Sequence, residues 1–322
     1  MEKIDRNSRN FSFPGQLGIF LAFIGAGLII GTIVSVILWL TMTGRPVLSM
    51  AQDMFDPKYY NAIMMMQVVS TFFMFFLPVY FTALICYRNP SRFLGLKTRI
   101  NFQQVLLVLA ILIITFPLSG ALAELNKIIL IPKSWEIYFK AKEAERAAQE
   151  AALININSFG RYVLSMIIIA LLPAVFEEFC FRGGLQNILT RWFKGPWVAI
   201  ILTSIVFSAV HASYYGFLVR FALGVALGLI FYYSGSLWLS VLLHFLYNGL
   251  QVTALYFATM NGKPSSKEIE DNFPLWAGIV ALAFIIFAFL KFRQISLQQQ
   301  EKFVMPEIDD PNDYHNWITK ES

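Results

Sequence analysis

The chain has 322 residues, of which 57% are hydrophobic and only 14% are charged, and its mean hydropathy is +0.60. This composition is far more apolar than that of a soluble domain and indicates a polytopic membrane protein. The net charge of +5 and the pI near 9.1 are typical of a protein whose basic loops face anionic lipid and cytoplasm, so we exclude nucleic-acid binding.

Long apolar runs recur along the whole chain, and about 20 such residues suffice to cross a bilayer as a helix. The runs lie near residues 16–42, 61–87, 103–122, 160–181, 196–213, 216–233, 236–258 and 274–291. The first run is too long for a signal peptide and lacks a cleavage-site pattern, so we expect it to remain as an anchor. We therefore predict an all-α transmembrane bundle of about eight helices.

Basic residues in the short loops predict the orientation of this bundle. They precede the first run and follow the second, fourth and eighth runs, and they are Lys3, Arg6, Arg9, Arg88, Arg92, Lys97, Arg99, Arg191, Lys194, Lys291 and Arg293. With an even number of crossings these residues share one side, so we predict that both termini are cytoplasmic. We expect a bacterial plasma membrane rather than the endoplasmic reticulum.

The predicted domain organisation has four parts. They are N-terminal helices with an extramembrane loop helix (1–159), a catalytic core (160–258), a final transmembrane helix with its flank (259–293), and a polar cytoplasmic tail (294–322). The loop helix, at residues 133–152, mixes acidic and basic residues at helical spacings, so we expect it at the outer surface. A GxxxG at Gly224 and Gly228 favours close helix packing, either within the fold or between subunits.

Ionisable residues interrupt the apolar stretch LLPAVFEEFCFRGGLQ at residues 171–186. Such groups are costly inside a membrane unless they face a partner or a wet cavity, so they are functional candidates. On a helix, Glu178 and Arg182 share one face and can form an ion pair, whereas Glu177 points about 100° away. The two cysteines, Cys86 and Cys180, form no zinc motif or disulfide framework, and we interpret them as packing residues.

Two later apolar runs carry polar residues at the same four-residue spacing. His211 follows Phe207, and Asn248 follows His244. Together with Glu177, the two imidazoles and the amide offer a base, an acid and donors for an oxyanion. These are the groups that hydrolysis by an activated water requires.

In order and spacing, EEFCFR, FSAVH and HFLYN resemble the EExxxR, FxxxH and HxxxN motifs of the CPBP family of intramembrane proteases, also called the ABI or CAAX protease and bacteriocin-processing family. The resemblance covers about residues 162–250. It implies an all-helical intramembrane endopeptidase with its site in a cavity of the bundle. It also implies a membrane-associated peptide or protein substrate, such as a CAAX tail, a bacteriocin-type leader or a membrane-bound regulator.

The resemblance also implies a role for each motif residue. Glu177 is the expected general base that activates a water, and His211 shares this task. His244 and Asn248 are expected to stabilise the oxyanion. Glu178 and Arg182 are expected to shape the site and balance its charge. Phe207 is expected to pack beneath His211.

Zinc is the alternative to a metal-free mechanism. Glu177, His211 and His244 offer the His2Glu ligand set of a catalytic zinc site. The sequence has no HExxH, however, and a glutamate mechanism accounts for the same residues. We therefore expect a glutamate-type protease without a cofactor.

Straight helices would place Glu177 near the cytoplasmic side of the membrane and His211 near the opposite side, too far apart to share a water. Tilted or broken helices are needed to bring the two together, and Gly183, Gly184 and Pro196 are candidate break points. Two other classes of function use the same residue types. One is a proton-coupled transporter, and the other is a non-catalytic membrane scaffold. The sequence leaves the oligomeric state open.

Overall fold

The structure is a computed structural model that describes residues 8–54, 56–153, 156, 158–262 and 274–302. Within these residues the regular secondary structure is helical and no strand is present. Its helices are α1 (Phe13–Thr43), α2 (Met50–Asp53), α3 (Tyr60–Thr71), α4 (Leu77–Cys86), α5 (Pro90–Phe93), α6 (Phe102–Ile128), α7 (Lys133–Leu153), α8 (Phe159–Ser165), α9 (Leu172–Glu178), α10 (Asn187–Phe193), α11 (Pro196–Ala209), α12 (Phe217–Ser234), α13 (Leu237–Met260) and α14 (Leu275–Lys302).

Wide π-helical turns join several of these helices into longer rods. Phe72–Phe76 connects α3 to α4, while Met166–Leu171 and Phe179–Gln186 connect α8, α9 and α10. Helices α8, α9 and α10 therefore form one continuous apolar helix of 35 residues, Phe159–Phe193. Single π turns inside helices are frequent at functional sites.

Seven helices in the described part of the chain are long and apolar enough to cross a membrane. They confirm the predicted all-α multi-pass bundle, and the chain is an integral membrane protein. The predicted run at 196–213 differs from the others, because it forms α11 with only 14 residues. At 1.5 Å per residue α11 is about 21 Å long, which is shorter than the hydrocarbon core.

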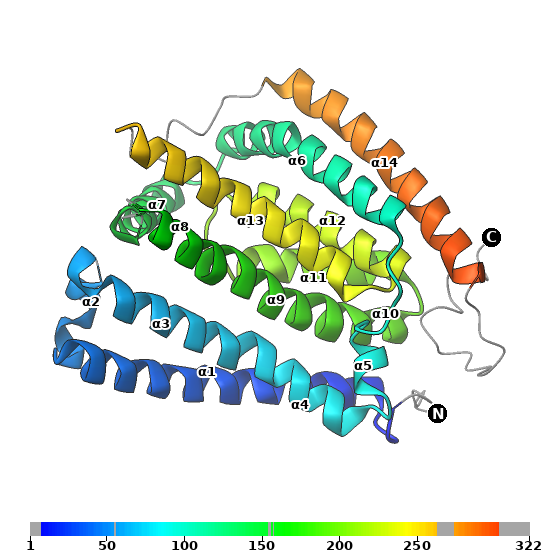
Figure 1. The fold of residues 1–322 in the computed structure, drawn as a ribbon, viewed down its shortest axis with the longest axis horizontal. Helices are drawn as coiled ribbons and strands as arrows, with labels where there is room; N and C mark the ends of the chain where they lie inside the picture. Colours follow the sequence, from blue (N-terminus) through cyan, green and yellow to red (C-terminus); the bar gives the residue numbers. More distant parts are fainter. Residues whose placement is uncertain (1–7, 55, 154–155, 157, 263–273, 303–322) are drawn as a thin grey trace.

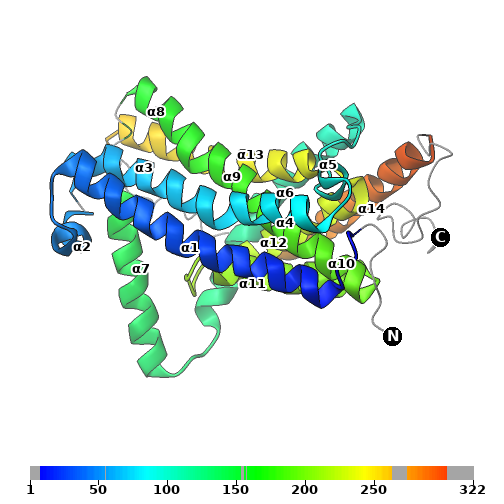
Figure 2. The ribbon, with the colours of Figure 1, turned by 90° about the horizontal axis from the view of Figure 1, so that it is seen from below.

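The long helices lie side by side along one direction (Figure 1). Helices α1, α3 and α4 form one edge and α6 and α14 form the other, with α8–α13 between them. The first turn of α1 and the last turn of α14 lie at the same end of the bundle as α5 and α10, whereas α7 lies at the opposite end and projects from it (Figure 2). The basic loops at α5 and α10 thus share an end with the start of α1, and that this end is cytoplasmic stays a prediction.

Side-chain exposure is inverted relative to a soluble protein. Large apolar side chains of the outer helices are exposed, for example Ile29 at 65%, Ile279 at 71% and Phe284 at 60%, while Glu178 and Arg182 are fully buried. Apolar side chains outside and polar groups satisfied inside are what a lipid environment requires.

The predicted break points have different structural roles. Gly183 and Gly184 do not interrupt the helix, and a Cβ on Gly184 would lie only 2.6 Å from Cγ2 of Val79. Their function in the fold is close helix packing. The chain does turn before Pro196, the first residue of α11, where Lys194 adopts a left-handed conformation with φ of 57°.

The GxxxG glycines pack α12 against α11 within the fold. A Cβ on Gly224 would lie 2.9 Å from Cβ of Ser204, and one on Gly228 would lie 3.0 Å from Cγ2 of Ile200. Only glycine permits so close an approach. The carbonyl oxygens of Gly224 and Gly228 also remain accessible to donors from the segment Phe179–Gln186.

The final helix extends beyond the predicted boundary at residue 293. Helix α14 continues to Lys302, and Ser296 is buried and accepts a hydrogen bond from Nε2 of Gln104 at 2.9 Å. The first part of the predicted tail is thus helical and packed on α6. The rest of it, residues 303–322, lies outside the described residues.

Candidate active site

The two adjacent glutamates are the last residues of α9, near the middle of the 35-residue helix. Glu177 is 8% exposed and Glu178 is fully buried. Because consecutive helical residues point about 100° apart, the two carboxylates face different neighbours. The two carboxylates therefore have different environments.

Glu178 forms the ion pair that its spacing predicts. Nη1 of Arg182 donates to Oε1 of Glu178 at 2.6 Å, and Nη2 donates to the carbonyl oxygen of Gly224 at 3.1 Å. The guanidinium also lies 4.7 Å from the ring centroid of Phe207. The buried arginine is thus held by a carboxylate, a carbonyl and an aromatic face, which together compensate its removal from water.

His244 bridges the two glutamates. Its Nδ1 lies 3.0 Å from Oε1 of Glu178, and its Nε2 lies 3.9 Å from Oε2 of Glu177. A carboxylate paired with arginine only accepts hydrogen bonds, so Nδ1 carries the proton. In the neutral imidazole the lone pair of Nε2 therefore faces Glu177.

His211 presents its ring to Glu177 in the same way. Its Nδ1 lies 2.7 Å from the carbonyl oxygen of Phe207, and its Nε2 lies 3.9 Å from Oε2 of Glu177. Because a carbonyl only accepts, Nδ1 is the donor here too, and the lone pair of Nε2 faces Glu177. The side chain of His211 is 29% exposed, against 4% for His244.

Glu177 therefore has one oxygen at the meeting point of two imidazoles. Its Oε2 is buried and has no hydrogen-bond partner among the described residues. The distance of 3.9 Å to each Nε2 is too long for a direct hydrogen bond, but a water can bond to both members of each pair. The arrangement is that of a site for a small polar molecule.

The length of the helix that carries the glutamates explains how His211 reaches Glu177. The predicted run ends near residue 181, but the helix continues to Phe193. Glu177 therefore lies 16 residues before the end of its helix, about 24 Å along the axis, and His211 lies 15 residues after Pro196, about 22 Å along α11 and the turn that follows it. The two side chains thus reach the same depth without a break in α11.

Phe207 packs where these side chains meet. It is 1% exposed, and its ring centroid lies 5.1 Å from that of His211, 5.7 Å from that of His244 and 5.2 Å from that of Phe181. The edge-on geometry of these contacts is typical of stable aromatic packing. Phe207 thus orients His211 through its carbonyl and supports both imidazoles through its ring.

Asn248 lies one turn after His244 on α13 and is half-buried. Among the described residues it has no hydrogen-bond partner. The structure does not bring it into contact with Glu177, so its amide is available to a bound molecule. Cys180, which belongs to the same stretch as the glutamates, is 2% exposed within the apolar core.

Arg220 on α12 is a charged neighbour that the sequence motifs did not include. Its charge acts on both Glu177 and Tyr247. Two guanidiniums, on Arg182 and Arg220, thus stand near two carboxylates. An arginine inside the apolar run at 216–233 is the signal that points to it.

Glu177, His211 and His244 are also the correct types of ligand for catalytic zinc. Within the described residues, no group of three or more His, Cys, Asp or Glu side chains is arranged to hold a metal ion. The donor set thus fits zinc in its chemistry, and the expectation of a site without metal stays a prediction.

Comparison with known proteins gives one match. Residues 159–250 match the family model described as type II CAAX prenyl endopeptidase Rce1-like. This segment contains all three motifs and agrees with the resemblance to the CPBP intramembrane proteases. No match was found among curated proteins or solved structures.

Proposed function

We propose that this chain hydrolyses a peptide bond of a membrane-associated substrate with a water activated by Glu177. The premise is that residues 159–250 match the Rce1-like, CAAX-type endopeptidases and belong to a multi-pass membrane protein. The observation that carries the proposal is the convergence of two Nε2 atoms on the unpartnered Oε2 of Glu177. That position suits a nucleophilic water.

The chemical step begins with a water held between Glu177 and His211. Glu177 takes a proton from the water as its oxygen attacks the carbonyl carbon of the substrate, and His211 accepts the other hydrogen bond of the water through Nε2. Glu177 then returns the proton to the leaving amine, so the carboxylate is regenerated. The hydrogen bond from Nδ1 of His211 to the carbonyl oxygen of Phe207 already orients the imidazole. His211 therefore loses little conformational freedom in this step.

The tetrahedral intermediate carries a negative oxygen that needs donors. His244 can offer Nε2–H only with a second proton, which it takes from bulk water before the substrate binds, and Glu178 stabilises the resulting imidazolium because it accepts from Nδ1. The amide of Asn248 is the second donor, one turn further along α13. A donor aimed at an oxyanion in a dry site typically lowers the barrier by about 3 kcal/mol.

Glu178 and Arg182 act on the other side of His244. Their ion pair holds Glu178 in place, so that it can orient the imidazole. No step in this scheme passes through a metal or another cofactor. We further propose that both termini face the cytoplasm and that the membrane is a bacterial plasma membrane.

The test is a cleavage assay on the purified, detergent-solubilised protein with a quenched membrane-peptide library. Wild type, Glu177→Gln and His244→Ala are compared, each with and without a strong zinc chelator. Glu145→Gln is the matched control, because that glutamate is exposed on α7 and pairs with Lys142. We expect cleavage by wild type and Glu145→Gln only, unaffected by the chelator.

Three results would contradict the proposal. Loss of cleavage with the chelator and recovery with zinc would make Glu177, His211 and His244 metal ligands. Equal cleavage by wild type and Glu177→Gln would show that Glu177 is not the general base. Proton-coupled uptake of a solute that survives Asn248→Ala, with no cleavage, would identify a carrier instead.

A further inference from the structure

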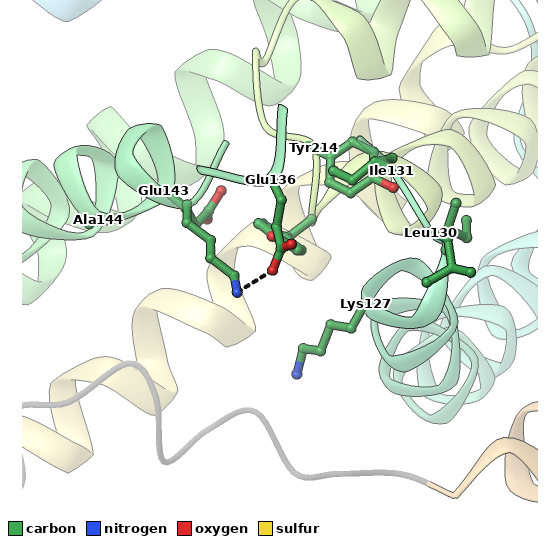
Figure 3. Close-up of a pocket in the computed structure, with 10 residues that line it drawn as sticks. Lys127, Leu130, Ile131, Glu136, Glu143, Ala144 and Tyr214 are labelled. Atoms are coloured by element: carbon green, nitrogen blue, oxygen red, sulfur yellow. Dashed lines mark hydrogen bonds and ion pairs between the residues drawn. The ribbon is translucent and has the colours of Figure 1, made fainter. Parts of the chain in front are cut away.

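A cavity lies at the α7 end of the bundle, between the end of α6, helix α7 and the loop that follows His211 (Figure 3). Its volume is about 730 Å³. Cavities of roughly 300–1,000 Å³ are typical of ligand sites. None of the motif residues lines this cavity, so its role is not explained by the water-activating site itself.

The wall of the cavity contacts the loop that carries His211. Oγ of Ser213 donates to Oε2 of Glu143 on α7 at 3.0 Å, and the rings of Phe139 and Tyr214 stack with centroids 4.8 Å apart. Tyr214 and Glu143 both line the cavity. Tyr214 is three residues from His211, a stretch that spans at most about 10 Å.

The loop backbone is also constrained at this point. Ala212, directly after His211, has φ of 50°, a left-handed conformation that a residue other than glycine seldom adopts. Such conformations persist only where surrounding contacts hold them, and they gather at functional sites. Contacts with α7 are among those that hold this loop.

Charge on the cavity wall is balanced. The lining contains the cations Lys127 and Lys140 and the anions Glu136 and Glu143. Nζ of Lys140 lies 2.5 Å from Oε1 of Glu136, the pair drawn as a dashed line in Figure 3. A balanced wall gives no strong attraction to a multiply charged ligand such as a nucleotide.

The remaining wall is suited to a peptide. Ile129, Leu130 and Ile131 form its apolar part, and Tyr214 and Tyr215 add aromatic rings. An extended peptide offers aliphatic side chains that can pack against such a wall.

We propose that this cavity binds the extramembrane segment of the substrate polypeptide next to the scissile bond. The inference rests on the proposed protease function and deepens it. Because Tyr214 of the cavity wall and His211 belong to the same short loop, a chain bound in the cavity can continue along residues 210–216 toward Glu177. Helix α7 is the outer wall of this substrate site.

The experiment fills the cavity without touching the catalytic residues. Ala144→Trp places a large ring at a position that lines the cavity, and Ala141→Trp is the matched control, since Ala141 is also exposed on α7 but does not line it. Both sites are exposed, so both variants are expected to fold. Their melting temperatures in detergent verify this.

Two readouts are needed. In the Glu177→Gln background, the Kd of a fluorescent membrane peptide from the library is measured with its extramembrane extension and after truncation at the bilayer boundary. We expect Ala144→Trp to raise the Kd of the extended peptide about tenfold and to leave that of the truncated peptide unchanged. In the active background we expect KM for the extended peptide to rise and kcat to stay the same.

The proposal is overturned if Ala144→Trp and Ala141→Trp bind the extended peptide equally, or if Ala144→Trp weakens both peptides equally. It is also overturned if phosphatidylglycerol vesicles displace the peptide from wild type and from Ala144→Trp alike, which would identify a lipid site. Cleavage of the truncated peptide by wild type reports separately on the proposed function, so the two failures are distinguishable.

Discussion

The two sides of the 159–193 helix differ sharply at the point where its adjacent glutamates diverge. On one side, Glu178 is fully buried and its Oε1 accepts hydrogen bonds from Arg182 and His244. On the other side, Glu177 faces two imidazoles at 3.9 Å, and its Oε2 has no hydrogen-bond partner among the described residues.

This difference teaches that identical side chains one residue apart can serve stability and chemistry separately. A buried charge held by partners stabilises the fold only as long as its partners remain. Oε2 of Glu178 also lacks a partner, so the two glutamates differ in their other contacts: Oε1 of Glu178 is held by two donors, whereas Glu177 accepts no hydrogen bond among the described residues. A buried carboxylate without any such bond is costly to the fold and useful to a substrate. Substitutions on the two sides should therefore affect different measurements.

The largest effect on stability is expected for Arg182→Met. It leaves Glu178 buried without its cation, which typically lowers the free energy of unfolding by about 3–5 kcal/mol. Glu177→Gln is expected to change that free energy by less than about 1 kcal/mol, because no hydrogen bond within the fold is lost from Oε2. Denaturant titration of the detergent-solubilised protein measures both.

The double variant Arg182→Met/Glu178→Gln serves as the control for this prediction. Removal of both charges should restore part of the lost stability, since the remaining amide carries no unpaired charge. If Arg182→Met unfolds at the same denaturant concentration as wild type, the assignment of this side to stability is wrong.

Asn248→Ala is expected to lower kcat without an effect on stability. Loss of one oxyanion donor lowers kcat about 10²-fold, which corresponds to about 2.7 kcal/mol of barrier. The melting temperature should not change, because Asn248 has no hydrogen-bond partner among the described residues. Steady-state cleavage kinetics and a thermal melt together check the prediction.

Asn187→Ala is the matched asparagine control. Asn187 is buried, donates from Nδ2 to the carbonyl oxygen of Phe93 and accepts from Nε of Arg191 at 3.2 Å. We expect this substitution to lower the melting temperature and to leave kcat of the folded enzyme unchanged. The opposite pattern in the two variants would refute the division into catalytic and structural amides.

Gly224→Ala should have an intermediate effect on stability. The added Cβ would lie 2.9 Å from Cβ and 3.1 Å from Cα of Ser204, so α12 must move away from α11. Overpacking of this kind typically costs about 1–3 kcal/mol of unfolding free energy. The movement should also disturb the hydrogen bond from Arg182 to the carbonyl of Gly224.

Gly25→Ala on α1 is the comparison variant, because no atom lies within 4 Å of its added Cβ. Replacement of an open helical glycine by alanine stabilises a helix by about 0.5–1 kcal/mol. Denaturation of the two variants in parallel therefore isolates the cost of helix contact. Equal stability of both would mean that α11 and α12 tolerate separation.

The smallest effect is expected for the exposed pair on α7. The hydrogen bond that Lys140 donates to Glu136 lowers the pKa of Glu136 and raises the pKa of Lys140. A lowered acid pKa means that the pair contributes above the ordinary pKa of Glu136 and loses its contribution as the pH falls through the lowered value. Solvent screens this exposed pair, so Lys140→Ala should leave the melting temperature unchanged between neutral and mildly acidic pH.

Lys142→Ala is the control for that variant, because Lys142 forms an equally exposed pair with Glu145. A drop in melting temperature for Lys140→Ala alone would show that the cavity wall contributes to the fold. That result would add a structural role to α7.

The sequence alone predicted the class of protein and most of its helices, because the hydrophobic length of a helix is a local property of the chain. It also predicted the Glu178–Arg182 pair, since both residues lie on one face of one helix. The three motifs identified the residues of the site. Their four-residue spacing, however, only describes positions within single helices.

The tertiary structure decided how those helices meet. The extension of the glutamate helix to Phe193 places Glu177 at the depth of His211, and the orientation of α13 lets His244 contact Glu178 while it faces Glu177. The contact between α7 and the loop after His211 likewise joins segments that are far apart in sequence. Such relations depend on the depth and rotation of one helix against another, which packing sets and the period of a single helix does not encode.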